Sequence, residues 1–123
     1  YRTAEGLLPA CRTAAVGALP AHHEDHFGIP NILIEGRAAG APVVCTGLPS
    51  LAELVEHRES GLFVPERNPE ALADAIGELL ADPTLASRLA EEGRRRVVEH
   101  FDMTQTVAEL VRTFQAATGR EAA

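Results

Sequence analysis

Residues 26–44 of the chain, HFGIPNILIEGRAAGAPVV, contain the change of pattern from which the fold can be predicted. Asn31 is a favoured N-cap residue, and Gly40 is a favoured residue just past a helix end. Between them the apolar side chains recur at helical spacing, in Ile32, Leu33, Ile34, Ala38 and Ala39. This stretch therefore predicts a short helix that starts near Asn31 and stops at Gly40.

Apolar runs flank the predicted helix on both sides. Ala14–Pro20 and Pro42–Thr46 are short, lie next to proline or glycine, and have the composition of buried strands. The order strand, loop, helix, strand describes one βαβ unit, which implies two parallel strands. Because ligands of such sheets bind at the carboxyl ends of the strands, the loop His22–Asn31 is the predicted binding region.

The rest of the chain predicts a third strand and several helices, and the fold class is α/β, a parallel sheet flanked by helices. Leu62–Val64 is a brief apolar stretch, and Leu51–Glu56 predicts a short helix. Three longer helices are expected to start at Asn68, Asp82 and Asp102. Their apolar stripes predict sides that face the core. The stripes are Leu72, Ala75, Ile76, Leu79 and Leu80, then Leu85, Leu89 and Val97, then Val107, Leu110, Val111 and Phe114.

Composition narrows the function classes. A length of 123 residues with 46% hydrophobic content fits one compact domain. No apolar run approaches the roughly 20 residues of a membrane-spanning helix, and nothing at the amino terminus is typical of a secretory signal, so we expect a cytoplasmic setting. The formal net charge of −7 disfavours nucleic acid as a partner. All 11 basic residues are arginines, which excludes Schiff-base lysine chemistry and the P-loop lysine from this segment.

Two smaller features receive structural interpretations. Cys11 and Cys45 lack the paired spacing of a zinc site or redox dithiol and are predicted to be buried, reduced thiols. Arg94–Arg96 lies on a predicted helix among Glu91, Glu92 and Glu99, so we expect a solvated face with ion pairs along the helix.

The predicted binding loop and the helix behind it could seat a nucleotide diphosphate. Gly28 permits close approach of the backbone to a ligand, and a helix that begins near Asn31 directs unpaired N–H groups toward the loop. Glu35 lies about one turn into that helix, where its carboxylate could accept hydrogen bonds from ribose hydroxyls. Many α/β domains share such a glycine and glutamate, so the geometry alone leaves the function open.

The same loop carries imidazole and carboxylate groups of the types that bind metals, in His22, His23, Glu24, Asp25 and His26. Consecutive loop residues seldom converge on one ion without a helical scaffold. We therefore expect no metal site.

Residues 28–83, from GIPNILIEGRAAGAPVV to GELLADP, resemble the carboxy-terminal domain of the retaining glycosyltransferases of family 4, also called glycosyl transferases group 1. The resemblance extends over about residues 8–116 and includes VPERNPEALADAI and EHFDMTQTVAEL. It implies a partial Rossmann-like sheet from the carboxy-terminal part of a GT-B fold. It also implies a nucleotide-diphosphate sugar of UDP or GDP type as donor, with no cofactor.

The family pattern assigns roles to residues of this chain by resemblance. The family's helix glutamate, matched by Glu35, holds the ribose, and backbone amides matched by residues 28–32 meet the diphosphate. The predicted nucleotide-sugar-binding residues are therefore Phe27, Gly28, Ile29, Pro30, Asn31, Ile32 and Glu35. The short GIPN loop resembles members that build bacterial surface polysaccharides.

Phe27 departs from the family pattern, which has a glutamate eight positions before Glu35. A phenyl ring cannot accept a hydrogen bond from a sugar hydroxyl or stabilise a positive transition state. Either Asp25 or Glu24 takes over the role, with Asp25 as the candidate catalytic residue, or the handling of the donor sugar is altered or lost.

The resemblance also implies that residues 1–123 are only the later part of the nucleotide-sugar-binding domain. The amino-terminal acceptor domain would be absent, and the last helix would cross back to it. We expect the isolated chain to be inactive and the full-length protein to be a retaining hexosyltransferase, with peripheral membrane association left open. A non-catalytic nucleotide-sugar-binding module and an unrelated doubly wound binding domain are the alternatives.

Overall fold

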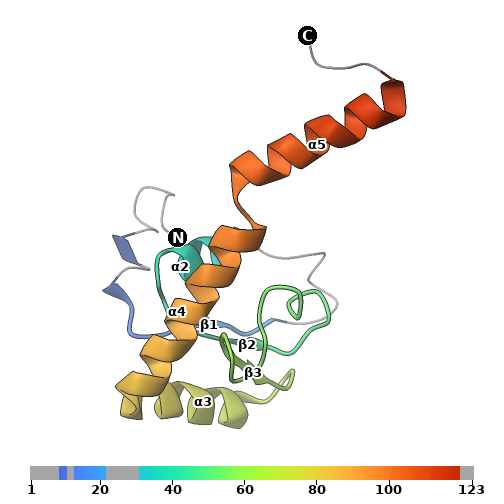
Figure 1. The fold of residues 1–123 in the computed structure, drawn as a ribbon. Helices are drawn as coiled ribbons and strands as arrows, with labels where there is room; N and C mark the ends of the chain where they lie inside the picture. The colour runs from blue at the N-terminus through green and yellow to red at the C-terminus, as the bar shows by residue number, and fades with distance from the viewer. Residues whose placement is uncertain (1–8, 11–12, 22–30, 120–123) are drawn as a thin grey trace.

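The computed structural model describes residues 9–10, 13–21 and 31–119, and its centre is a parallel sheet (Figure 1). The sheet has the order β1 (Gly17–Leu19), β2 (Val43–Thr46), β3 (Leu62–Val64). Gly17 pairs with Val43, and Val44 pairs with Leu62. The predicted α/β class and the βαβ unit around residues 26–44 are confirmed.

Helix α2 (Asn31–Ala38) connects β1 to β2 and ends as predicted at Gly40. Gly40 has a φ of 87°, a left-handed conformation that glycine adopts without steric cost. Its N–H donates to the Arg37 carbonyl at 3.0 Å, and the Ala41 N–H donates to the Gly36 carbonyl at 3.1 Å. These two bonds form a Schellman motif, which turns the chain sharply from the helix into β2.

Three longer helices complete the described chain, α3 (Pro69–Ala81), α4 (Pro83–His100) and α5 (Met103–Thr118). The predicted starts are confirmed, because each helix is capped by the expected side chain. Asn68 accepts from the Ala71 N–H at 2.9 Å and Asp82 from the Leu85 N–H at 3.1 Å. Asp102 caps α5 in the same way.

The core occupies both faces of the sheet because side chains alternate along β2. Val43 and Cys45 point into one apolar cluster, with α2 and the segment 48–55, and Val44 points into the other, with α3. Helix α4 contributes to both clusters, through Val97 on the first side and Leu89 on the second. A single long helix thus joins the two faces.

The apolar stripe of α5 does not pack against the core, contrary to the prediction. The stripe of α5 was predicted to face the core, but Met103, Val107, Leu110, Val111 and Phe114 are between 46% and 76% exposed. Helix α5 projects away from the sheet after the bend at Phe101 and Asp102, so no described element covers its apolar side (Figure 1). Leu80 of α3 is likewise exposed.

The predicted helix at residues 51–56 is instead a series of turns. Its hydrogen bonds alternate between three-residue and four-residue spacing, as in Leu54 N–H to Leu51 and Val55 N–H to Leu51. Leu51, Leu54 and Val55 are all fully buried. These three positions have the i, i+3, i+4 spacing of one helical stripe, so their burial agrees with the predicted pattern although the backbone is not a regular helix.

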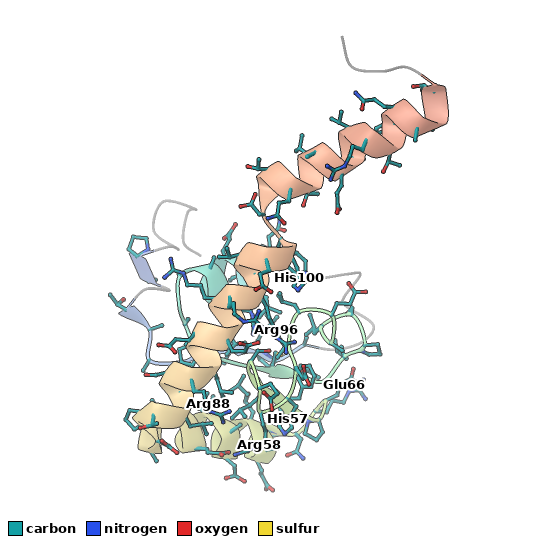
Figure 2. All side chains as sticks on the ribbon, viewed as in Figure 1. His57, Arg58, Glu66, Arg88, Arg96 and His100 are labelled. Atoms are coloured by element: carbon teal, nitrogen blue, oxygen red, sulfur yellow. The ribbon has the colours of Figure 1, made fainter. Side chains whose placement is uncertain are left out.

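The turn between residues 56 and 61 is tied to its neighbours by polar contacts (Figure 2). Arg58, which has a left-handed φ of 65°, forms an ion pair with Glu78 of α3 at 2.7 Å. The His57 Nδ1 atom accepts a hydrogen bond from the Phe63 N–H at 2.9 Å, and the two rings stack. The turn is therefore fixed to both β3 and α3.

The structure tests the two interpretations of basic and sulfur-containing side chains. Arg95 bonds to Glu92 and Glu99 along α4, so the predicted ion pairs are confirmed, although half-buried Arg96 also reaches Glu56 at 2.7 Å. Cys45 is a free, buried thiol, as predicted, and burial raises its pKa to about 12. Cys11 lies outside the described residues. None of the described helices is both long and apolar enough to traverse a bilayer.

We expect Gly93→Ala to destabilise the fold. A Cβ atom at position 93 would lie 2.8 Å from the Arg37 Nη2 atom and 3.3 Å from the Ser60 carbonyl oxygen. Such overpacking costs about 1–3 kcal/mol, against a gain in helix propensity of about 1 kcal/mol. Gly77→Ala is the matched control, since position 77 of α3 has open space around it. Urea unfolding should show a lower midpoint for Gly93→Ala and a higher one for Gly77→Ala. A gain at both positions would contradict the packing.

Candidate functional site

The candidate site lies at the carboxyl ends of the strands, where α2 begins. In a βαβ unit the connecting helix starts at this edge, so Asn31 and the ends of β1 and β2 share one side of the sheet. No acidic side chain occurs in the first turn of α2. The positive end of its dipole is therefore not neutralised from within the helix, and it is suited to an anion.

Three of the predicted binding residues share one face of α2. Asn31, Ile32 and Glu35 are exposed, whereas the opposite face of the helix is buried through Leu33 and Arg37. The Glu35 carboxylate is thus accessible to a ligand at the side of the helix, about one turn from its amino end. This placement is compatible with a carboxylate that accepts hydrogen bonds from sugar hydroxyls.

The other predicted site residues lie outside the part of the chain that the structure describes. They are Asp25, Phe27, Gly28, Ile29 and Pro30, together with the remaining members of the cluster His22–His26. Within the described residues, no three histidine, cysteine, aspartate or glutamate side chains gather as metal ligands would.

Thr46 lies at the end of β2, next to the candidate site, and was not singled out from the sequence. Its Oγ1 atom accepts a hydrogen bond from the Ala21 N–H at 2.7 Å, and Thr46 and Ala21 are both buried. This bond ties the last described residue before the predicted loop to the end of β2. A polar side chain that ends an otherwise apolar strand was the available signal.

Arg37 was also missed, and it is the most unusual side chain of the fold. It is 1% exposed, and its Nη1 atom donates to the Ser60 carbonyl oxygen at 2.7 Å. Its Nε and Nη2 atoms have no hydrogen-bond partner within the described residues. Burial lowers the pKa of Arg37 to about 10, and the Arg96 charge acts in the same direction. Its place four residues after Leu33, on the buried stripe, was the signal in the sequence.

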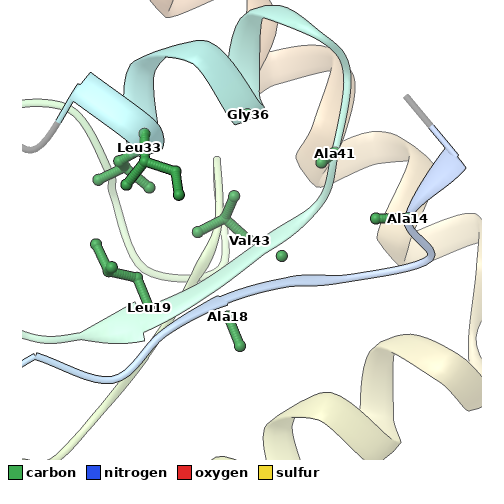
Figure 3. Close-up of a pocket in the computed structure, with 9 residues that line it drawn as sticks. Ala14, Ala18, Leu19, Leu33, Gly36, Ala41 and Val43 are labelled. Atoms are coloured by element: carbon green, nitrogen blue, oxygen red, sulfur yellow. The ribbon is translucent and has the colours of Figure 1, made fainter. Parts of the chain in front are cut away.

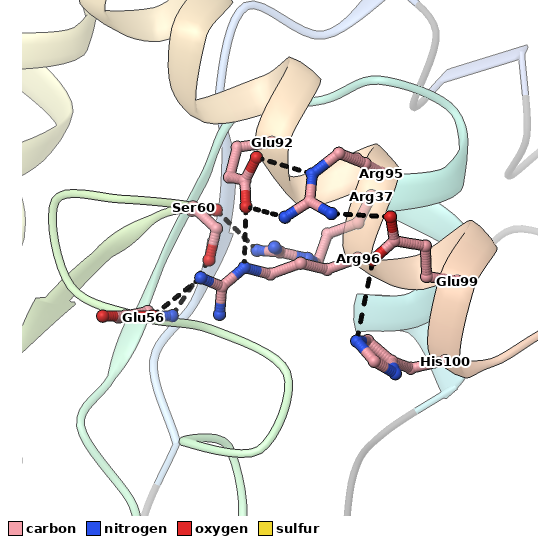
Figure 4. Close-up of polar contacts among 8 residues, drawn as sticks. All are labelled: Arg37, Glu56, Ser60, Glu92, Arg95, Arg96, Glu99 and His100. Atoms are coloured by element: carbon pink, nitrogen blue, oxygen red, sulfur yellow. Dashed lines mark hydrogen bonds and ion pairs between the residues drawn. The ribbon is translucent and has the colours of Figure 1, made fainter.

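Charged side chains of α4 lie around Arg37 and Ser60 (Figure 4). The Glu92 carboxylate accepts from Arg95 at 2.6 Å and from Arg96 at 3.1 Å, and these bonds lower the pKa of Glu92 to about 2. Arg96 continues to Glu56, in the turn that holds Ser60. The same turn therefore receives contacts from both α2 and α4.

A small apolar cavity of about 120 Å³ lies between β1 and α2 (Figure 3). Among the described residues that line it, none carries a charged side chain. The exposed residue Ile32 lies at this cavity and at the candidate site. The lining comes from Ala14, Gly17, Ala18, Leu19, Ile32, Leu33, Gly36, Ala41 and Val43.

Comparison with known protein families identifies the family of this chain. The family model described as Glycosyl transferases group 1 matches residues 2–82, which is more than half of the sequence. The chain belongs to this glycosyltransferase family. A glycogen synthase from Mycobacterium tuberculosis is 36% identical over 102 residues, which cover 83% of this chain and 24% of that protein. The resemblance of residues 28–83 to glycosyl transferases group 1 is confirmed.

Solved structures agree with the fold of this glycosyltransferase chain. Sucrose-phosphate synthase from Thermosynechococcus elongatus superposes with a TM-score of 0.73 at 34% identity, over 85% of this chain and 26% of that chain. Anabaena Alr3699/HepE, in complex with UDP, gives a TM-score of 0.80 at 19% identity, over 86% of this chain and 29% of that chain. The architecture is the partial Rossmann-like sheet of a GT-B carboxy-terminal domain. The chain spans about a quarter of the length of these relatives.

We expect Thr46→Val to destabilise this glycosyltransferase chain by about 1–3 kcal/mol, because it leaves the buried Ala21 N–H without its acceptor. Thr46→Ser is the matched control, since it keeps the hydroxyl oxygen and removes only a methyl group, at a cost of about 0.8 kcal/mol. Free energies of unfolding in urea would compare the two variants. If Thr46→Val were as stable as Thr46→Ser, the bond to Ala21 would not contribute.

Proposed function

We propose that this chain is the later part of the nucleotide-sugar-binding domain of a retaining hexosyltransferase. The full-length enzyme would bind a nucleotide-diphosphate sugar of UDP or GDP type and transfer the glycosyl group to an acceptor. The observation that carries the proposal is the exposed face of α2, where Glu35 lies beside a helix amino end. The complex of Anabaena Alr3699/HepE with UDP favours a uridine nucleotide.

In this proposal the first turn of α2 binds the diphosphate and Glu35 binds the ribose. The first turn of α2 would stabilise the diphosphate, both as bound ligand and as leaving group, through its N–H groups and dipole. Glu35 would accept hydrogen bonds from the vicinal hydroxyls of the ribose, which orients the nucleotide. Neither role requires a metal ion, since backbone amides and basic residues can balance the charge of the leaving group.

The remaining parts of the enzyme follow from the size of the relatives. Because the chain spans about a quarter of their length, we propose that an amino-terminal acceptor domain and the early strands of the present domain complete the protein. The exposed stripe of α5 would then pack on that amino-terminal domain, which explains apolar side chains without a partner among the described residues. Synthesis of a surface polysaccharide in the cytoplasm is the proposed setting.

The proposal predicts that the full-length protein binds UDP or GDP and that Glu35→Ala weakens this binding by about tenfold to a hundredfold. That range corresponds to hydrogen bonds to a charged group, about 1.5–3 kcal/mol. Isothermal calorimetry with UDP, GDP and UDP-glucose would measure it. Glu91→Ala, another exposed helical glutamate, is the control and should bind as the wild type does. Absence of nucleotide binding, or equal affinity for Glu35→Ala and wild type, would contradict the proposal.

A degenerate nucleotide-sugar-binding module is the second candidate, and Phe27 is the residue that favours it. Phe27→Glu restores the acid of the family pattern and Phe27→Gln is its uncharged control. If the enzyme has lost transfer through Phe27, radiolabelled sugar transfer by the full-length protein should rise by about a hundredfold in Phe27→Glu alone, the scale of one transition-state contact. Efficient transfer by the wild type would contradict this second candidate. The 123 residues alone should transfer no sugar.

A further inference from the structure

We propose that Arg37 is a positioning residue, which fixes the rotation of α2 and so directs Glu35 toward the ligand. The role of Glu35 in this inference rests on the proposed function. Consecutive residues of an α-helix are about 100° apart around its axis. Glu35 and Arg37 therefore point in nearly opposite directions, and a contact that holds one of them sets the direction of the other.

The guanidinium of Arg37 is confined on two sides by glycines. A Cβ atom at Gly93 of α4 would lie 2.9 Å from the Arg37 Cζ atom, and one at Gly61 would lie 3.5 Å from the Nη1 atom. The side chain thus occupies a slot whose width depends on the absence of a side chain at position 93. A planar group in such a slot has little freedom to rotate.

The acceptor of Arg37 is itself held in place. Ser60 is 1% exposed, its Oγ atom accepts from the Glu56 N–H at 2.9 Å, and its own N–H donates to the Glu56 carbonyl oxygen at 3.0 Å. The bond from Arg37 to the Ser60 carbonyl oxygen therefore joins α2 to a rigid turn (Figure 4). Glu56 in that turn is paired with Arg96 of α4.

The energetics argue against a role in stability alone. The Arg37 guanidinium, whose Nε and Nη2 atoms have no hydrogen-bond partner in the described part of the chain, has lost hydration that its bond to Ser60 does not replace. Substitution of a buried charged group by an apolar residue of similar volume is often neutral or stabilising. What Arg37 adds is a directional bond to one carbonyl group, and α2 is short enough, at 8 residues, for one such bond to set its orientation.

The test compares Arg37→Met, which replaces the guanidinium by an unbranched apolar side chain, with Arg37→Lys, which keeps a nitrogen donor for Ser60. In the full-length protein without ligand, amide hydrogen exchange of residues 35–38, whose N–H groups are bonded within α2, should accelerate about tenfold in Arg37→Met, which corresponds to 1.4 kcal/mol. Exchange in α3 and the unfolding midpoint should stay at the wild-type values. Arg37→Lys should restore most of the protection. Unchanged exchange in residues 35–38 of Arg37→Met would overturn the inference, whether or not the protein binds a nucleotide.

The second arm uses UDP and GDP affinity in a double-mutant cycle. If Arg37 acts through Glu35, Arg37→Met should weaken binding about tenfold in the wild-type background and not at all in the Glu35→Ala background. An equal loss in both backgrounds would show that Arg37 acts by another route and would overturn its role as a positioning residue. Failure of the wild type to bind either nucleotide would instead overturn the proposed function, and with it the part assigned to Glu35.

Discussion

The fold depends on burial of β2 on both faces. Strand β2 is the middle strand of the described sheet, and all four of its residues are buried, with Val43 and Cys45 on one side and Val44 on the other. A strand of this kind needs a layer of helices on each face, because neither side can meet water without exposing apolar surface. The positions of α2, α3 and α4 follow from this requirement, and the start of α2 lies at the edge of the sheet formed by the carboxyl ends of the strands.

The sequence revealed those parts of the fold that depend on local patterns. Helix starts at Asn68, Asp82 and Asp102 and the stop at Gly40 could be predicted because each rests on one side chain or one glycine close to the helix end. The stripe of α5 could not be placed, since periodicity identifies an apolar side without identifying what it packs against. The turns at residues 51–56 were predicted as a helix because Leu51, Leu54 and Val55 recur at helical spacing, although the hydrogen bonds there mix three-residue and four-residue spacing.

For the candidate site, too, local features could be predicted from the sequence and long-range contacts could not. The exposed position of Glu35 follows from the helical pattern around it. The contacts of Thr46 and Arg37 could not be predicted, because their partners are the backbone of Ala21, 25 residues away, and of Ser60, 23 residues away. Contacts between side chains and distant backbone atoms leave no periodic trace. The signals that such contacts exist are the position of Arg37 on an otherwise apolar stripe and that of Thr46 at the end of an otherwise apolar strand.

The choice of arginine at position 37 has a physical basis that extends to α4. A guanidinium keeps its charge when it is buried, whereas a buried lysine readily loses its proton. The pKa of Arg37 is lowered to about 10, still above neutral pH, so the group remains a charged donor to Ser60. Because the slot that holds it is closed by Gly93, the orientation of α2 is linked to the position of α4. Helix α4 contributes to both core clusters. The orientation of α2, which carries Glu35, therefore depends on packing on both faces of the sheet and not only on the strand next to it.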